Sequence, residues 1–175
     1  MPDYVSDLEI AKLAGETTMT TSAHEGGCLC GGLRYRIKDE GLALTACHCT
    51  DCQRSGGAAF GMSLLLLKSS AEVVKGTPRT FTKIFEEDGR LKHNKFCGEC
   101  GVRIWTEFSK FPQIVNVKPG TLDDTSWLEP VAHIWVRSKQ PWVSIPEGAL
   151  QFETQPADFG VVLKAFAEQR AAQQR

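Results

Sequence analysis

Short segments with strand-like patterns of apolar and polar residues occupy most of the chain between residues 26 and 152. Residues 33–37 and 80–85 alternate with a period of two, which is typical of a strand with one buried face. Residues 60–67 form a short apolar run, which fits a strand buried on both faces. Residues 86–89 supply a turn, so that 80–85 and 90–96 are predicted to form a hairpin. Further short strands are predicted over 102–108, 114–117 and 132–136.

Glycine and proline turns separate these segments, and no strand–helix–strand alternation is visible. The pattern therefore predicts a mainly β protein with a small antiparallel fold. Near the C-terminus the period changes, because Phe159, Val162, Leu163 and Phe166 are spaced as one stripe of a helix. This stripe predicts a C-terminal helix that packs on the sheet.

The chain has 175 residues, which fits a single domain with its own core. We predict three parts: an N-terminal extension over 1–23 with one short helix at 7–14, a β domain over 24–155, and a C-terminal helical segment over 156–175 packed on that domain. The extension carries no pattern that suggests chemistry.

Composition and charge narrow the function classes. The N-terminus is acidic and lacks the apolar stretch of a signal peptide, and the longest uncharged stretch, 55–67, is shorter than the about 20 residues of a membrane helix. We therefore expect a soluble, cytoplasmic protein with no membrane partner. Lysine and arginine number 20 and aspartate and glutamate 21, so no strong field attracts nucleic acid. The nearest basic cluster, residues 92–95, is interpreted as a solvated strand face.

The seven cysteines fall into three groups, and none lies outside a group. Cysteines one or two residues apart can reach the same Zn²⁺ ion, whose thiolate ligands lie at about 2.3 Å. The outer groups supply four thiolates for a closed structural site; an extended segment would turn Cys28 and Cys30 to one face. These ligands are Cys28, Cys30, Cys97 and Cys100.

The middle group has three cysteines, Cys47, Cys49 and Cys52. Three protein ligands leave a fourth position for water or substrate, which is typical of catalytic zinc sites. Alternatively, a fourth ligand other than cysteine closes the site, and the local candidates are His24, His48, His93 and Asp51. Since His48 lies between two ligands, alternation turns it away from the metal, so we interpret it as a supporting or surface residue.

Three motifs resemble those of the glutathione-dependent formaldehyde-activating enzyme family, also called the CENP-V/GFA domain family, of the Mss4-like superfamily. The motifs lie at residues 26–31, 47–56 and 96–101, and segments 120–124 and 130–135 are also similar. The resemblance implies a small antiparallel β fold with two zinc ions. It implies a structural zinc on Cys28, Cys30, Cys97 and Cys100 and a catalytic zinc on Cys47, Cys49 and Cys52.

The resemblance also implies an activity, the addition of glutathione to formaldehyde, which is a carbon–sulfur lyase reaction when written in reverse. We therefore expect an enzyme that acts on adducts of a small thiol, such as glutathione, with a small aldehyde. In this hypothesis Arg54 balances the anionic centre or holds a substrate carboxylate, and His48 is a candidate catalytic residue. The aromatic residues Phe60, Trp105 and Trp135, and likewise His133, are interpreted as packing. The alternative is a non-catalytic binding module whose two metals are both structural.

Overall fold

The computed structural model describes residues 23–173, which form two compact units. Within the described range, unit 1 contains residues 42–63 and 129–173, and unit 2 contains residues 23–41 and 64–128. The predicted extension, with its helix over 7–14, lies outside the described residues except for Ala23. The predicted domain boundaries at 24–155 and 156–175 stay a prediction.

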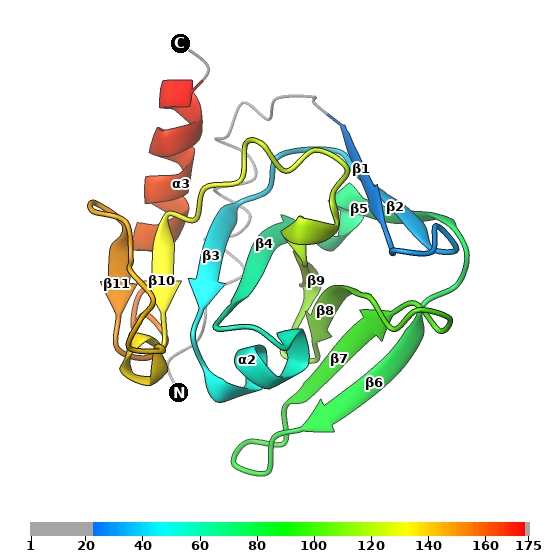
Figure 1. Ribbon diagram of the computed structural model, residues 1–175, viewed down its shortest axis with the longest axis horizontal. Helices are drawn as coiled ribbons and strands as arrows, with labels where there is room; N and C mark the ends of the chain where they lie inside the picture. The colour runs from blue at the N-terminus through cyan, green and yellow to red at the C-terminus, as the bar shows by residue number, and fades with distance from the viewer. Residues whose placement is uncertain (1–22, 174–175) are drawn as a thin grey trace. The chain divides into compact units, whose positions relative to one another are not determined.

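Unit 1 contains a group of three strands in the order β11-β10-β3, visible side by side in Figure 1. A short helix follows β3, a turn of 3-10 helix follows β10, and a longer helix ends the described chain. The elements are β3 (Ala43–Cys47), α2 (Thr50–Gly56), β10 (Ala132–Ile134), η3 (Val136–Ser138), β11 (Leu150–Phe152) and α3 (Gly160–Gln173).

Strand direction in unit 1 differs from the antiparallel prediction. Strand β10 pairs parallel with both β3 and β11. A parallel neighbour needs a long connection, whereas a two-residue hairpin can join only antiparallel strands. The chain leaves β3 at Cys47 and returns to β10 at Ala132, and residues 135–149 connect β10 to β11, so both connections are long enough.

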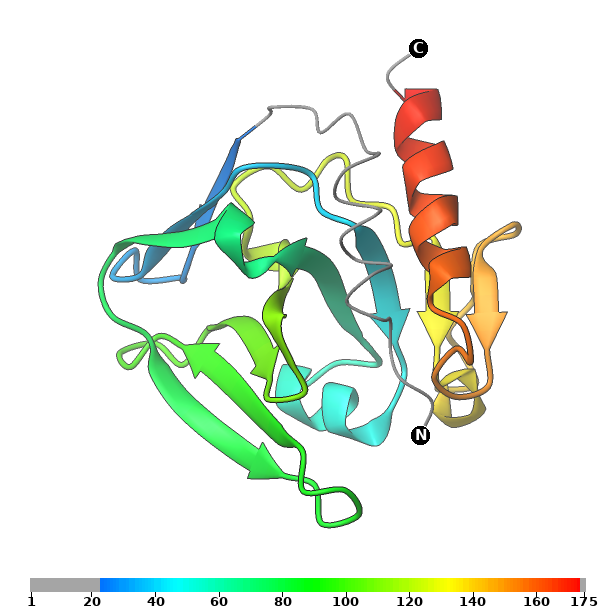
Figure 2. The same cartoon turned by 180° about the vertical axis from the view of Figure 1, so that it is seen from behind.

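Helix α3 follows the predicted apolar stripe. Phe159, Val162, Leu163 and Phe166 are all buried, and α3 contacts β3; Figure 2 shows the helix from behind, running beside the strands of unit 1. The helix begins at Gly160 rather than at Pro156, after Oδ1 of Asp158 accepts a hydrogen bond from the Gly160 N–H at 2.7 Å. Burial of one apolar face is the main source of stability for a helix of this length.

Unit 2 contains two groups of strands, and every pairing described within it is antiparallel. One group has the order β1-β2-β5 and the other the order β4-β9-β8-β7-β6. The strands are β1 (His24–Gly27), β2 (Arg34–Ile37), β4 (Gly61–Leu67, in this unit from Leu64), β5 (Ala71–Lys75), β6 (Arg79–Ile84), β7 (Leu91–Phe96), β8 (Arg103–Phe108) and β9 (Phe111–Val117), with turns of 3-10 helix at η1 (Lys68–Ser70) and η2 (Pro119–Thr121).

The predicted strands at 33–37, 60–67, 80–85, 90–96, 102–108 and 114–117 are confirmed as β2, β4, β6, β7, β8 and β9. Their buried side chains include Tyr35, Leu64, Ile104 and Val117. Four strands were missed: β1, β3, β5 and β11. In β3 every residue is buried, so no alternation marks it. The predicted strand at 132–136 ends at Ile134 because Trp135 takes a left-handed conformation.

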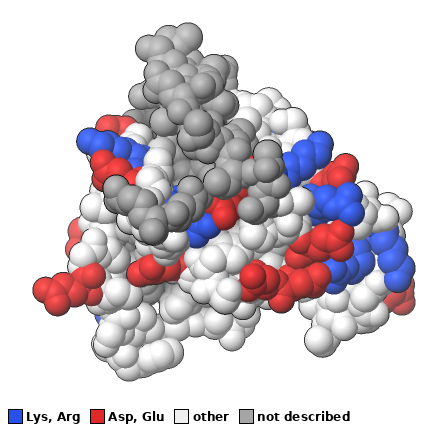
Figure 3. Space-filling model, turned by 90° about the horizontal axis from the view of Figure 1, so that it is seen from above, with Lys and Arg blue, Asp and Glu red and all other residues white. Residues whose placement is uncertain are grey.

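No helix in the described part of the chain is long and apolar enough to cross a membrane. On the face shown in Figure 3, acidic and basic side chains are interspersed and neither sign forms a field of its own. The mainly β class with a C-terminal helix is confirmed, whereas the cellular location stays a prediction.

Candidate metal centres

The seven cysteines form two clusters, one in each unit. Cys28, Cys30, Cys97 and Cys100 lie in unit 2, and Cys47, Cys49 and Cys52 lie in unit 1. Within each cluster all Sγ atoms lie within 4.8 Å of one another. Among the described residues no histidine, aspartate or glutamate joins either cluster. Each cluster could hold a metal ion, as the grouping of the cysteines predicted.

The four-cysteine cluster is built from two tight turns. Gly31 N–H donates to Cys28 O and Gly101 N–H donates to Cys97 O, both at 3.0 Å. Both glycines have positive φ, 68° and 75°, which other residues adopt only at a cost. The prediction that Cys28 and Cys30 share one face of an extended segment is wrong, because they lie in the turn after β1. The turn itself brings their sulfurs to 3.4 Å.

The sulfur spacing of this cluster fits tetrahedral zinc. Cys28 Sγ lies 3.4 Å from Cys30 Sγ, and Cys30 Sγ lies 3.7 Å from Cys97 Sγ. Sulfurs at about 2.3 Å from a tetrahedral ion would lie about 3.8 Å apart. The Leu33 N–H also donates to Cys28 Sγ at 3.2 Å, which favours a thiolate there.

The close approach of these sulfurs gives the thiols of Cys28 and Cys30 very different pKa values. Burial of Cys28 opposes ionisation, but hydrogen bonds from Leu33 N–H and the neighbouring thiols lower the pKa of Cys28 to about 6. The pKa of Cys30 rises to about 12, although the Gly32 N–H opposes this, because neighbouring sulfurs disfavour a second charge. Several thiolates this close need a cation, and a set of four thiolates suits zinc.

The three-cysteine cluster combines a strand end with a helix start. Cys47 ends β3 and is 8% exposed. Cys49 is the N-cap of α2, and its Sγ accepts a hydrogen bond from the Cys52 N–H at 3.4 Å. Cys52 lies in the first turns of α2, half-buried like Cys49. The N-cap geometry therefore directs two sulfurs toward the one that ends the strand.

The three sulfurs of this cluster also need a compensating cation. Hydrogen bonding with Cys49 and Cys52 strongly raises the pKa of the Cys47 thiol, and burial raises it further. The pKa of Cys49 is raised as well: hydrogen bonding to the Cys47 thiol favours its thiolate, but the Cys52 thiol and burial outweigh that effect. Three soft sulfur donors suit zinc and provide only three of the four ligands of a tetrahedral site.

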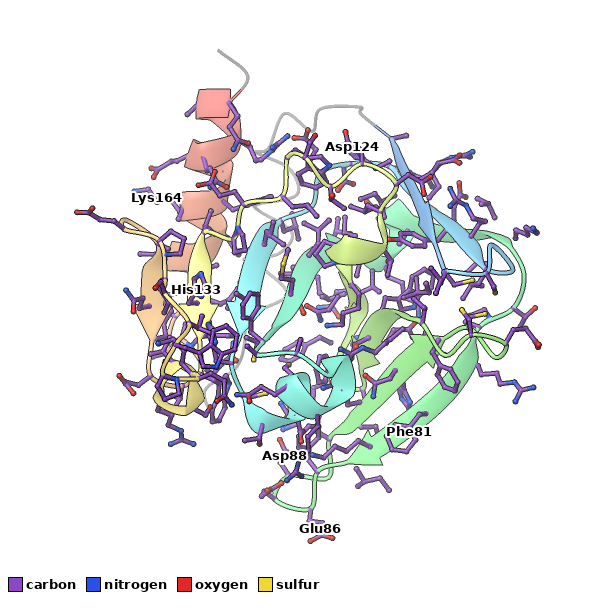
Figure 4. All side chains as sticks on the ribbon, in the orientation of Figure 1. Phe81, Glu86, Asp88, Asp124, His133 and Lys164 are labelled. Atoms are coloured by element: carbon purple, nitrogen blue, oxygen red, sulfur yellow. The ribbon has the colours of Figure 1, made fainter. Side chains whose placement is uncertain are left out.

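His48 does not join the cluster, in agreement with the alternation argument. Its side chain is fully buried, and Nε2 lies 2.9 Å from Nδ1 of His133 on β10, so one of these nitrogens donates and the other accepts. The two rings stack with centroids 5.2 Å apart, and the Phe60 ring lies 5.3 Å from His48. Burial lowers the pKa of both histidines. Figure 4 shows His133 on its strand.

The other alternative ligands lie elsewhere. The His24 ring packs 4.9 Å from the Trp127 ring, and Nδ1 of His93 lies 2.9 Å from Oγ1 of Thr82. Asp51 lies in the first turn of α2 but is not one of the clustered ligands. Of the described residues, therefore, none supplies a fourth ligand to the three-cysteine cluster.

Arg54 and the predicted packing aromatics have distinct environments. Arg54 lies in the last turn of α2 and is exposed. Trp105 is 8% exposed and forms part of the core, as expected. Phe60 and Trp135 are only half-buried. Sequence reasoning therefore placed Trp105 well and overstated the burial of the other two aromatic residues.

A side-chain network that the sequence analysis missed holds the three-cysteine loop. Nε2 of Gln53 donates to His48 O at 2.7 Å and to Ser138 O at 2.8 Å, and Oε1 of Gln53 accepts from Nε2 of Gln140 at 2.8 Å. The Ser138 hydroxyl lies within hydrogen-bond distance of His48 O and Trp135 O, at 3.0 and 3.1 Å. No sequence signal links residues 85 positions apart, so only the structure reveals this network.

Trp135 is the one non-glycine residue with positive φ in the described part of the chain, at φ 59° and ψ 39°. A bulky residue in this conformation is an outlier and indicates strain. Hydrogen bonds hold it on both sides: its N–H donates to Thr154 O at 3.1 Å, and its carbonyl accepts from the Ser138 N–H at 3.1 Å. Arg137 also lies over the Trp135 ring, 4.8 Å from its centroid.

Comparison with known proteins places these clusters in a family. The model of the family described as "Glutathione-dependent formaldehyde-activating enzyme" matches residues 23–138. A protein of Halomonas elongata named "Putative glutathione-dependent formaldehyde-activating enzyme" is 27% identical over 125 residues, which cover 69% of this chain and 80% of that protein. A crystal structure of a Rhodobacter sphaeroides protein aligns with a TM-score of 0.47 at 20% identity, over 59% of this chain and 91% of the other.

The matched region contains both cysteine clusters, together with Gln53, His48 and Ser138 of the polar network; Gln140 lies beyond it. It begins before Cys28 and ends at Ser138, whose hydroxyl lies beside His48 O. It spans well over half of the 175 residues. On this match, the chain belongs to the glutathione-dependent formaldehyde-activating enzyme family.

Proposed function

We propose that this protein is a zinc enzyme that joins the thiol of glutathione, or of a similar small thiol, to formaldehyde or another small aldehyde. The observation that carries the proposal is the three-cysteine centre of Cys47, Cys49 and Cys52, which supplies one ligand fewer than a closed tetrahedral site needs. The family name and the name of the Halomonas elongata relative support glutathione and formaldehyde as the substrates.

The two centres have different roles in this proposal. Cys28, Cys30, Cys97 and Cys100 hold a structural zinc that ties together two turns of unit 2. Cys47, Cys49 and Cys52 hold the catalytic zinc in unit 1. A closed set of four ligands leaves no position for substrate, whereas a set of three leaves one.

The reaction is an addition in which all atoms are retained. The sulfur of the thiol forms a bond to the aldehyde carbon, the carbonyl π bond breaks, and the thiol proton ends on the former carbonyl oxygen, giving a hydroxymethyl thioether. Written in reverse, the carbon–sulfur bond breaks, which is lyase chemistry. A zinc ion at the open centre would supply its charge to favour the thiolate form of the substrate.

The protein's own residues orient this centre. Cys49 holds the start of α2 against the other two ligands, because its sulfur accepts the Cys52 N–H. Gln53 holds the His48 carbonyl between two ligands, which limits movement of the loop. Arg54 is exposed on α2, and we propose that it attracts a substrate carboxylate. His48 faces His133, so we propose that it supports the loop rather than transfers the substrate proton.

Two cysteine variants test the assignment. Wild type should contain two zinc ions per chain. Cys52→Ser should lose one zinc, keep its fold, and lose thiol–aldehyde addition by at least about 100-fold. Cys97→Ser should lose the other zinc and should be less stable, because the metal-binding free energy of a structural site contributes to folding.

The outcomes separate the enzyme from the alternative, a binding module with two structural metals. If Cys52→Ser keeps full activity, the three-cysteine centre is not the reaction site and the proposal is wrong. If wild type holds both zinc ions but shows no activity with any small thiol and aldehyde, the binding-module reading replaces it. A cytoplasmic location follows from this chemistry as a further expectation, since the compartment keeps thiols reduced.

A further inference from the structure

Strands β6, β7 and β8 of unit 2 carry an excess of positive charge. Their basic residues are Arg79, Lys83, Lys92, Lys95 and Arg103, and their one acidic residue is Glu107. The whole chain, by contrast, has a formal charge of −1. The excess is therefore a local property of this hairpin and its neighbouring strand.

The strand register divides these charges between two faces. Lys92 pairs with Lys83 on one side and with Phe108 on the other, and Asn94 pairs with Phe81 and Thr106. Paired residues share a face, so we call this set the Lys92 face. Lys95 and Glu107 alternate onto the opposite face, where Lys95 Nζ donates to Thr80 Oγ1. The Lys92 face therefore carries Lys92 and Lys83, and the one acidic residue of these three strands lies on the opposite face.

Lys92 is the unusual member of this face. Its exposed fraction is only 9%, which contradicts the expectation that residues 92–95 form a solvated strand face. Its side chain makes no hydrogen bond or ion pair with the described residues, yet its Nζ is not among the fully buried polar atoms. It also lies directly opposite another lysine, Lys83. Burying a charge without a partner, opposite a like charge, is unfavourable, so an anion would stabilise this arrangement.

A polar group beside Lys92 is oriented to donate. Oδ1 of Asn94 accepts from Nη1 of Arg103 at 3.3 Å and from Oγ1 of Thr106 at 3.2 Å. With its oxygen occupied by two donors, Asn94 presents its Nδ2 hydrogens to any further partner. Asn94 is also 9% exposed and follows Lys92 by two residues on the same face, about 7 Å along the strand.

We propose that the Lys92 face binds a small oxyanion, a carboxylate or phosphate group, with Lys92 as the charged anchor and the Asn94 amide and Arg103 guanidinium as neighbouring donors. The donor set is cationic and rich in N–H groups, which is the chemistry that recognises such groups. The inference does not depend on the proposed thiol chemistry, because no cysteine takes part.

The burial of Lys92 favours a small ligand over nucleic acid. A nucleic-acid surface is normally an exposed basic patch that neutralises many phosphates, with aromatic residues on which bases stack. Phe81 is exposed on this face, at 62%, as Figure 4 shows on β6. Its cationic neighbour Lys92, however, is only 9% exposed. We therefore commit to a small oxyanion and treat an oligonucleotide as a competing outcome of the test.

The test compares two lysine-to-methionine variants of one strand. Lys92→Met removes the proposed anchor and keeps the apolar stem, whereas Lys95→Met makes the same charge change on the opposite face. Calorimetric titration of the full chain uses inorganic phosphate, succinate and a glutathione analogue with serine in place of cysteine, at constant ionic strength set with chloride. Phosphate and succinate distinguish the two oxyanion classes, and the analogue tests a peptide carboxylate without a thiol.

We expect at least one of the three probes to bind saturably, with affinity at least tenfold weaker for Lys92→Met and within twofold of wild type for Lys95→Met. Phosphate or the other bound probe should also raise the unfolding midpoint of wild type but not that of Lys92→Met. Absence of saturable binding, or equal loss in both variants, overturns the proposal. Tighter, Lys92-dependent binding of a single-stranded oligonucleotide also overturns it. Lys83→Met should also weaken binding relative to wild type, although less than Lys92→Met. If Lys92→Met does not fold, Lys83→Met takes its place in the comparison with Lys95→Met.

Discussion

The side-chain amide of Gln53 donates a hydrogen bond of 2.7 Å to the main-chain oxygen of His48, across the loop that carries the three clustered cysteines. The same amide group donates to Ser138 O, so both of its N–H groups are used. The residues between β3 and α2, His48 and Cys49, thus have their backbone held by a side chain of α2. The loop geometry depends on a residue that is not itself a ligand.

Replacing Gln53 by glutamate should destabilise this loop. The carboxylate would replace two donors and face two carbonyl oxygens, leaving acceptors unsatisfied at a cost of about 1–3 kcal/mol in unfolding free energy. We expect weaker zinc retention at the three-cysteine centre, measured by chelator competition, together with a lower urea midpoint. Gln151→Glu, on an exposed position of β11, is the matched control and should change neither. Equal behaviour of the two variants would mean that the network does not hold the loop.

Removal of His133 should destabilise the core of unit 1. In His133→Leu the buried Nε2 of His48 loses its partner, and Nδ1 of His48 already has none, so we expect a loss of about 1–3 kcal/mol. The double variant His48→Phe/His133→Leu removes both polar groups and should recover part of that loss. Chemical denaturation of the three proteins gives the coupling free energy. Additive losses in the double variant would contradict a direct interaction between the two rings.

Alanine substitutions at Gly101 and Gly56 should separate the effect of backbone strain from the effect of steric crowding. No atom lies within 4 Å of a Cβ built on Gly101 or on Gly56, but only Gly101 has positive φ, at 75°. We expect Gly101→Ala to cost about 1 kcal/mol and to weaken zinc binding by the four-cysteine cluster, because the turn after Cys97 is strained. Gly56→Ala, at the end of α2, should be neutral or slightly stabilising. Zinc release rates and thermal unfolding provide the comparison, and an equal effect of both substitutions would rule out the backbone explanation.

The Glu107 carboxylate of unit 2 should make the unfolding free energy depend on pH. Burial of Glu107 opposes ionisation, but hydrogen bonds from Lys68 Nζ at 2.9 Å and Trp105 Nε1 at 3.1 Å outweigh it and hold the pKa of this carboxyl below its usual value. Because the folded-state pKa is lowered, this stability is present above about pH 4.5 and is lost as pH falls through the folded-state pKa.

The contribution should be at most about 1 kcal/mol, since Lys68 is largely exposed. Glu107→Gln should flatten the pH dependence of the unfolding free energy between pH 5 and 3, measured by urea denaturation, roughly the range over which such a carboxylate titrates. Glu86→Gln, at the tip of the β6–β7 hairpin in Figure 4, should leave the profile unchanged. If Glu107→Gln shows the same pH dependence of the unfolding free energy as wild type, the Glu107 carboxylate does not cause it.

The metal clusters could be predicted because their spacing is local. Cysteines one or two residues apart can reach one ion whatever the rest of the chain does, and counting them separates four ligands from three. The alternation of residues 33–37 and 80–85 likewise reports a half-buried strand directly. Strand β3 escaped prediction because burial of all its residues removes the alternation.

The amino-acid sequence by itself determined the cysteine grouping, most strands of unit 2 and the apolar stripe of α3. Only the tertiary structure decided that Cys28 and Cys30 lie in a turn, that β10 lies parallel to β3, and that Gln53 binds the carbonyls of His48 and Ser138. It also turned Lys92 from an expected solvated residue into a buried one. The physical reason is range: periodicity and spacing act over a few residues, whereas burial and hydrogen-bond partners are set by segments that meet only when the chain folds.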